Sequence, residues 1–141
     1  MIMLIGILGS ILGLGVSAHL YQKKLAHTKL VCPLRTRCDQ VLHSRYATSL
    51  GIPNELLGMI YYTFAYVLYV VLLSYHGMYA PLVLLALAIL SLLGLTMSMY
   101  LLSLQAFIIR AWCMWCLLSA LATVCIALGV SGAAGVALAG F

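Results

Sequence analysis

Two pairs of cysteines are the residues in this sequence that are most able to do chemistry. Cys32 and Cys38 have five residues between them in a polar stretch, whereas Cys113 and Cys116 form the Cys-x-x-Cys motif "WCMWC" where a long apolar segment begins. Three kinds of site use four cysteines in this way. They are a structural disulfide framework, a four-thiolate zinc site, and two dithiols that exchange a disulfide.

The position of the close pair favours thiol–disulfide exchange. A disulfide framework is hard to justify in a helical bundle that packing already stabilises, and the gap between Cys32 and Cys38 is wider than the usual zinc knuckle. Cys113 lies near a predicted helix N-terminus, where the helix dipole and Arg110 one turn earlier favour a thiolate. A zinc-stabilised membrane scaffold, without catalysis, stays the alternative.

Exchange at membrane depth needs an electron acceptor that the membrane can hold. The sequence has no glycine-rich nucleotide loop and no pair of intramembrane histidines for haem. A lipid-soluble two-electron carrier, a quinone of the ubiquinone or menaquinone type, suits the dithiol best. The fifth cysteine, Cys125, lies half a helical rotation from Cys116 and deeper in the segment, which is typical of a small core residue.

The elements that position these cysteines are predicted to be membrane helices. Hydrophobic residues make up 66% of the 141 residues and charged residues only 6%, so the chain cannot cover a water-exposed surface. A spanning helix needs about 20 apolar residues. Four segments meet this length: 2–20, which we expect to be a helix and not a removed leader, 56–75, 79–109 and 111–139. We predict an all-α integral membrane protein: one domain, 1–141, a four-helix bundle with a cysteine-bearing loop or short helix at 21–55.

Small residues at helical spacing predict close packing of the first and last helices. Gly9 and Gly13 are four residues apart, as are Ser131 and Gly135. Pairs of this spacing lie on one helix face and let two backbones approach in lipid.

The order of the motifs resembles the vitamin K epoxide reductase family, including its prokaryotic disulfide-forming members. The segment "VCPLRTRCDQVLHSRYATSLGIPNELLGMIYY" (residues 31–62) contains the spaced cysteines, a Ser-Arg-aromatic triplet and a Gly-Ile-Pro before the second helix, and "WCMWC" follows. In the unrelated bacterial quinone-linked disulfide oxidases of DsbB type, the close pair comes first and the spaced pair later.

The resemblance implies a path for electrons through the four cysteines. Cys116 would contact the quinone, and Cys113 would be its partner and exchange with the loop. Cys38 would pass electrons to Cys113, and Cys32 would exchange with an external dithiol. The implied enzyme is a quinone-dependent oxidoreductase that generates protein disulfides.

The resemblance also implies residues that form the quinone pocket. Asn54 occupies the position of an amide that hydrogen-bonds the quinone carbonyl in the animal enzymes, although it also suits a helix N-cap. Ser44 and Tyr46 would shape the loop or the pocket wall. Ala120 stands where animal members have a substrate-binding Tyr, so recognition of vitamin K epoxide itself is not expected. No thioredoxin-like domain is fused within these residues, and we expect a separate thioredoxin-like protein as the redox partner.

The distribution of basic residues predicts the orientation of the bundle. Six of the seven lie between the first two apolar segments, which is typical of a topology signal and not of nucleic-acid binding. The seven, all expected on the cysteine side, are Lys23, Lys24, Lys29, Arg35, Arg37, Arg45 and Arg110. The positive-inside rule therefore predicts a multi-pass cell-membrane protein whose cysteines face the cytosol, with the extracytoplasmic face as the alternative.

Overall fold

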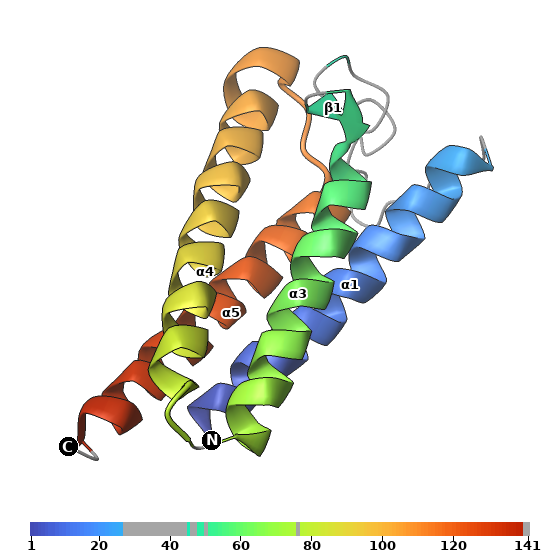
Figure 1. Cartoon of the computed structure of the whole chain (residues 1–141). Coiled ribbons are helices and arrows are strands. Elements are labelled where there is room, and N and C mark those ends of the chain that lie inside the picture. The colour runs from blue at the N-terminus through green and yellow to red at the C-terminus, as the bar shows by residue number, and fades with distance from the viewer. Residues whose placement is uncertain (27–44, 46–47, 50, 76, 140–141) are drawn as a thin grey trace.

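Long helices dominate a computed structural model of the protein (Figure 1). The structure describes residues 1–26, 45, 48–49, 51–75 and 77–139. The elements, in chain order, are α1 (Ile2–Leu25), β1 (Thr48–Ser49), β2 (Ile52–Pro53), α3 (Asn54–Ser74), α4 (Ala80–Ser103), the π-helical segment η3 (Leu104–Ile109) and α5 (Met114–Ala139). Four stretches of helix are long and apolar enough to cross a membrane: α1, α3, α4 together with η3, and α5 up to Val136. The predicted four-helix membrane bundle is confirmed.

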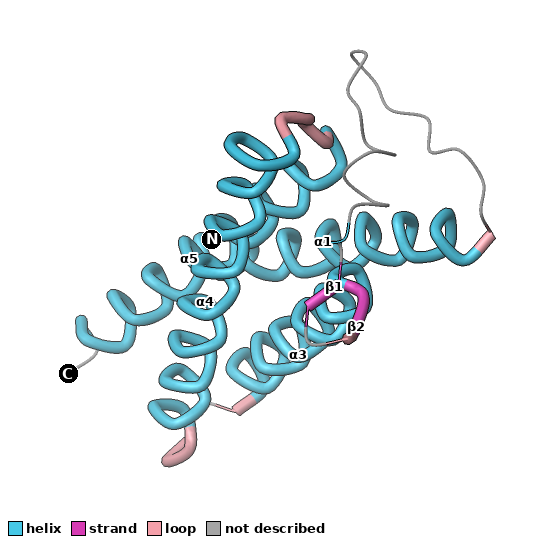
Figure 2. Tube along the Cα trace, turned by 90° about the horizontal axis from the view of Figure 1, so that it is seen from above, coloured by secondary structure: helices cyan, strands magenta, loops and turns pink. Residues whose placement is uncertain are grey.

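The chain crosses the bundle so that the two kinds of connection lie at opposite ends. The N-terminus, the turn between α3 and α4 and the last turn of α5 lie at one end (Figure 1). At the other end lie the last turn of α1, the β1–β2 hairpin, η3 and the start of α5, and we call this the cysteine end. Figure 2, viewed from above, shows the hairpin over the start of α3. The cysteine motif of α5 therefore shares one end of the bundle with Lys23 and Lys24 in the last turn of α1 and with Arg110, which directly follows η3.

Glycines let α1 approach its neighbours closely. A Cβ on Gly9 would lie 2.8 Å from the Cβ of Cys125 and 2.9 Å from the carbonyl oxygen of Ala122 in α5, and one on Gly13 would overlap the ring of Tyr62 in α3. The predicted close approach at Gly9 and Gly13 is confirmed, and Cys125 packs in this interface as a small residue.

The prediction for the last helix was wrong in register. Ser131 is exposed, and a Cβ on Gly135 would meet nothing within 4 Å. Gly129 and Gly132 make the contact instead, because Cβ atoms there would overlap or crowd Gly6 and Ile2 of α1. The face of α5 that packs on α1 includes Ala122, Gly129 and Gly132, which recur at helical spacing. Ser131 is two residues beyond Gly129 and therefore lies on another face of the helix.

The core lies where α1, α3, α4 and α5 converge. Its buried residues are Tyr62, Ala65, Tyr69, Leu72, Leu87, Ala122, Ile126, Val130 and Ala133. The hydroxyl of Tyr69 donates to the carbonyl oxygen of Ile126 at 2.6 Å, which satisfies a polar group that lipid could not. Large apolar side chains on the outer faces are exposed, as expected of helices that contact lipid tails.

Two helix boundaries and one additional element differ from prediction for identifiable reasons. α1 runs to Leu25 and not to residue 20, because its last turn is polar and is held by an ion pair at Lys24. α5 begins at Met114 and not at residue 111, because Arg110 has a left-handed φ of 53° that ends η3. A small antiparallel hairpin, with Thr48 opposite Pro53 and a turn glycine at φ 79° (Gly51), precedes α3 and was not predicted.

Candidate active site

The Cys-x-x-Cys motif occupies the N-terminus of α5. Cys113 immediately precedes the first helical residue, Met114, and its carbonyl oxygen accepts the N–H of Leu117 at 3.0 Å. The N–H of Cys116 donates to Sγ of Cys113 at 3.3 Å. Cys113 is therefore the N-cap of α5, with sulfur in the place of the usual side-chain oxygen, and only Cys116 is inside the helix. Both residues are free thiols in this structure.

The N-cap geometry lowers the pKa of the Cys113 thiol below its ordinary value. A hydrogen bond from the Cys116 side chain lowers the pKa of Cys113, and backbone N–H groups of Cys116 and Trp115 lower it further. Burial and the negative charge of Glu55 act in the opposite direction, but the pKa is lowered on balance. A thiolate is the nucleophile and the better leaving group in disulfide exchange, so the helix terminus prepares Cys113 for that reaction.

A buried amide in the preceding segment fixes the backbone of Cys113. Gln105 in η3 is only 3% exposed, and its Oε1 accepts the N–H of Cys113 at 3.2 Å. The chain turns back onto η3 through residues 110–113, starting with the left-handed Arg110. Sequence reasoning missed Gln105. The available signal was an amide in a long apolar segment, because polar side chains at membrane depth usually have a partner or a function.

A cavity of about 620 Å³ lies between α3, α4 and α5 near the cysteine end, with α1 residues at its edge. Cys116 is on its wall, whereas Cys113 is buried alongside with Leu20 and Ala111. The volume is within the range of small-molecule sites. Most of the wall is apolar and comes from residues such as Leu57, Phe64, Leu93, Met97 and Leu101.

Two adjacent tyrosines of α3 contribute polar groups to the wall. The hydroxyl of Tyr62 donates to the carbonyl oxygen of Ser119 at 2.7 Å and lies 3.1 Å from the hydroxyl of Thr123. The hydroxyl of Tyr61 is buried and makes no hydrogen bond within the described part of the chain. A Cβ on Gly94 of α4 would overlap the Tyr61 ring, so this glycine leaves room for the phenol.

The ends of α1 and α3 close the cavity on the cysteine side. Nζ of Lys24 lies 3.3 Å from Oε2 of Glu55, whose side chain is only 7% exposed. Glu55 is on the cavity wall, and so is Asn54 beside it. The ring of His19 lies 4.9 Å from that of Trp115, next to the cysteine motif. A buried carboxylate, an amide and a thiol are thus grouped around one apolar space.

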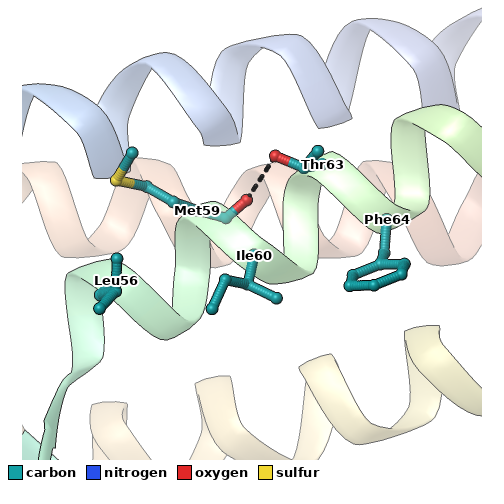
Figure 3. Close-up of a pocket in the computed structure, with 5 residues that line it drawn as sticks. All are labelled: Leu56, Met59, Ile60, Thr63 and Phe64. Atoms are coloured by element: carbon teal, nitrogen blue, oxygen red, sulfur yellow. Dashed lines mark hydrogen bonds between the residues drawn. The ribbon is translucent and has the colours of Figure 1, made fainter.

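A second hollow lies on the outer face of α3 and has no such chemistry. It measures about 290 Å³ and is lined by Leu56, Met59, Ile60, Thr63 and Phe64 (Figure 3). The hydroxyl of Thr63 donates to the carbonyl oxygen of Met59 in its own helix at 2.7 Å. The hollow has no titratable or nucleophilic side chain, and it is a lipid-facing groove of a spanning helix.

The sequence model of the vitamin K epoxide reductase (VKOR) family matches residues 4–130. This match covers four helices, the polar segment between α1 and α3, and the cysteine motif. The chain belongs to the vitamin K epoxide reductase family. No curated protein sequence matches it significantly. Together with the four spanning helices, membership makes the protein a multi-pass membrane oxidoreductase, and the family's chemistry is thiol–disulfide exchange.

The structure brings together three of the residues that the VKOR resemblance implied. Cys113 and Cys116 are adjacent at the start of α5, and Asn54 shares the cavity wall with Cys116. Asn54 is the first residue of α3, with Pro53 at the N-cap, so the N-cap interpretation was wrong. Ala120 lines the same cavity. The other implied residues, Cys32, Cys38, Ser44 and Tyr46, lie outside the described residues.

Proposed function

We propose that this VKOR-family protein oxidises the dithiol of a partner protein and reduces a membrane quinone. Electrons would pass from the partner to Cys32 and Cys38, then to Cys113 and Cys116, then to the quinone. The observation that carries the proposal is that Cys113 and Cys116 have different environments. Cys116 faces the apolar cavity, while Cys113, whose pKa is lowered, is held at the helix N-terminus beside it.

The residues of the cavity fit a quinone headgroup. Its apolar wall suits a flat ring and an isoprenoid tail, and the amide of Asn54, which lines the same cavity, would bind a carbonyl oxygen. A bound quinone would accept two electrons and two protons. Cys116 would face it across the cavity, and Asn54 would orient it. The hydroxyl of Tyr62 already makes hydrogen bonds to Ser119 in α5, so we assign it no role in orienting the quinone.

The exchange steps use the acidity of Cys113. When the pair is oxidised, an Sγ–Sγ bond joins Cys113 to Cys116. A thiolate of the loop, which we assign to Cys38, attacks Sγ of Cys113 and releases the thiolate of Cys116. Cys32 then attacks Cys38, which frees Cys113 and leaves a Cys32–Cys38 disulfide for the partner's dithiol to reduce. Each attack forms one S–S bond and breaks one, and the two attacks together move two electrons from Cys32 and Cys38 to Cys113 and Cys116.

The partner and the orientation are part of the same proposal. We propose a separate thioredoxin-like protein as the donor, because its paired thiols can attack a disulfide between Cys32 and Cys38. Lys23 and Lys24 are in the last turn of α1 and Arg110 directly follows η3, so all three belong to the cysteine end, which supports a cytosolic position for that end.

Turnover in detergent tests the function. Purified protein, a reduced thioredoxin-like protein and a short-chain ubiquinone should produce quinol and oxidised partner in equal amounts. The Cys116→Ala variant should give only the uncatalysed background. Stoichiometric zinc bound to four protected thiolates, with no quinol formed by the wild-type protein, would contradict the redox function and favour the zinc-stabilised scaffold.

A further inference from the structure

Glu55 is a buried carboxylate that the exchange steps above do not use. It is the second residue of α3, only 8% exposed, and it lines the same cavity as Cys116. Its negative charge raises the pKa of the Cys113 thiol, against the stronger effects that lower it. The carboxylate therefore acts electrostatically on the reacting sulfurs and also borders the apolar space.

Stability alone gives a poor reason for a carboxylate in this place. Burying a charge at the edge of a membrane costs free energy, and an ion pair compensates only in part. The Lys24 ammonium at 3.3 Å offsets the cost of Glu55, but a neutral side chain of similar size would avoid it. Ionisable residues retained inside membrane proteins usually mark a pathway for protons or ions.

The proposed reaction needs such a pathway. Oxidation of Cys113 and Cys116 breaks two S–H bonds, forms one S–S bond and releases two electrons and two protons. The quinone takes up two electrons and two protons to become quinol. The apolar wall offers few groups that can carry a proton between the thiols and the acceptor. Glu55, which lines the cavity together with Cys116, is a carboxylate that can carry a proton there.

We propose that Glu55 is the proton carrier of the cavity, which takes a proton from the cysteine pair and delivers it toward the quinone. The inference rests on the proposed function. Nζ of Lys24 lies 3.3 Å from the carboxylate, and this side chain is 21% exposed at the cysteine end. Among the described residues, the titratable groups around Glu55 are Lys24 from α1, the two thiols at α5, and the cavity tyrosines Tyr61, Tyr62 and Tyr100.

Substitution at both ends of the ion pair separates proton transfer from packing. Glu55→Gln should lower kcat for quinone reduction about 100-fold, because a positioned acid–base group contributes at least that much. Its KM for quinone should change by less than about threefold, since the amide has nearly the same shape. Glu55→Asp and added acetate should each restore part of the rate.

Lys24→Met is the matched control, because it breaks the same ion pair and keeps the carboxylate. It should retain activity within about fivefold of wild type, far above Glu55→Gln. Equal losses in the two variants would show that only the ion pair matters and would overturn the proposal. A Glu55→Gln variant within about threefold of wild type would overturn it as well.

A spectroscopic arm does not depend on the folding of Glu55→Gln. Asp39 and Glu55 are the only acidic side chains in the sequence, so Asp39→Asn leaves Glu55 as the single side-chain carboxyl. Infrared difference spectra of this variant should show a carboxylic-acid band appearing and disappearing as bound quinone is reduced. An unchanged carboxylate signal during reduction would overturn the proposal.

A further arm is read in the quinone-free protein. Removing the charge of Glu55 should lower the pH at which the Cys113 thiolate forms, because that charge raises the pKa of Cys113. No shift would place Glu55 outside the site and contradict the inference. A wild-type protein that forms no quinol would instead contradict the proposed function, so the two failures are distinguishable.

Discussion

The two residues of the Cys-x-x-Cys motif differ because one caps the helix and the other is inside it. Sγ of Cys113 accepts the N–H of Cys116 and feels the positive end of the α5 dipole. Cys116, one turn further, faces the cavity. In the proposed reaction, Cys113 is therefore the leaving group in exchange with Cys38, and Cys116 is the electron donor to the quinone.

The acidity of Cys113 is directly measurable. In reduced, quinone-free protein, the thiolate absorbance that disappears in Cys113→Ser should develop at a pH below the ordinary thiol value of about 8.5. The reason is that hydrogen bonds from Cys116 and the helix N-terminus lower the pKa of Cys113, so the thiolate persists as the pH falls. A titration midpoint at or above the ordinary value would show that burial dominates and that the cap does not activate the thiol.

The loop cysteines should matter only to large donors. Cys32→Ala should cripple turnover with a reduced thioredoxin-like protein, because that partner cannot reach the buried Cys113, which is 0% exposed. Turnover with a small dithiol that can enter should be retained. Cys125→Ala, the matched control at the α1–α5 interface, should stay within about threefold of wild type with both donors. A Cys125→Ala loss as large as that of Cys116→Ala would mean that the pairs are assigned wrongly.

At this scale the sequence predicted the reactive pair but not the groups around it. Cysteine spacing and a helix start were enough to single out Cys113 and Cys116. Glu55 and Gln105 were missed because their roles depend on contacts with Lys24 and with the N–H of Cys113, which are far away along the chain or across a reversal. A polar residue in an apolar segment signals that a partner exists, but not which partner.

Among the elements, α1 positions the site by packing its glycine face on α5. Gly9 meets backbone atoms of α5, and Gly13 receives the ring of Tyr62, whose hydroxyl is bonded to α5 in turn. The three helices therefore hold one another at a fixed separation. This fixed separation sets the positions of the cavity walls and of Cys113 at the N-cap of α5.

A matched pair of glycine substitutions tests this packing. Gly9→Ala should destabilise the folded protein by about 1–3 kcal/mol, because its Cβ would press on the carbonyl oxygen of Ala122, a backbone atom that cannot move freely. Gly15→Ala in the same helix meets nothing within 4 Å and should be neutral or stabilising, since alanine favours helix. Thermal denaturation in detergent would compare them. Equal stability of the two variants would contradict the close contact.

The helices themselves were predictable from apolar length, and the predicted span 79–109 ends at Ile109 as observed, but the π-helical form of its last turn was not predicted. Hydropathy cannot distinguish α-helix from the π-helical η3, because both kinds of segment consist of apolar residues. It also cannot show that Arg110 ends the segment in a left-handed conformation. That conformation moves the start of α5 from residue 111 to Met114 and so makes Cys113 a cap.

For the whole molecule, charge and chemistry are concentrated at one end. The last turn of α1, the hairpin, η3 and the start of α5 lie together there (Figure 1). Lys23 and Lys24 are in that turn of α1, and Arg110 directly follows η3. The turn between α3 and α4 at the other end has no described lysine or arginine. This asymmetry is the basis for the proposal that the cysteine end faces the cytosol.

Labelling of intact cells tests that orientation. A membrane-impermeant maleimide should fail to label Cys32 and Cys38 even after reduction, because the proposal places them in the cytosol. Gly77→Cys, in the exposed turn before α4, should be labelled from outside. Labelling of the native loop cysteines, with protection of Gly77→Cys, would place the cysteine end outside the cell and leave the thiol chemistry unchanged.

The electron path through four cysteines is the central claim, and the quinol yield of a single reduction tests it most directly. The protein is fully reduced, freed of reductant, and mixed with excess short-chain ubiquinone. Because each dithiol holds two electrons, the wild-type protein should form two quinols per chain, Cys32→Ala/Cys38→Ala one, and Cys116→Ala none. Two quinols from the double variant, or any stoichiometric yield from Cys116→Ala, would contradict the path.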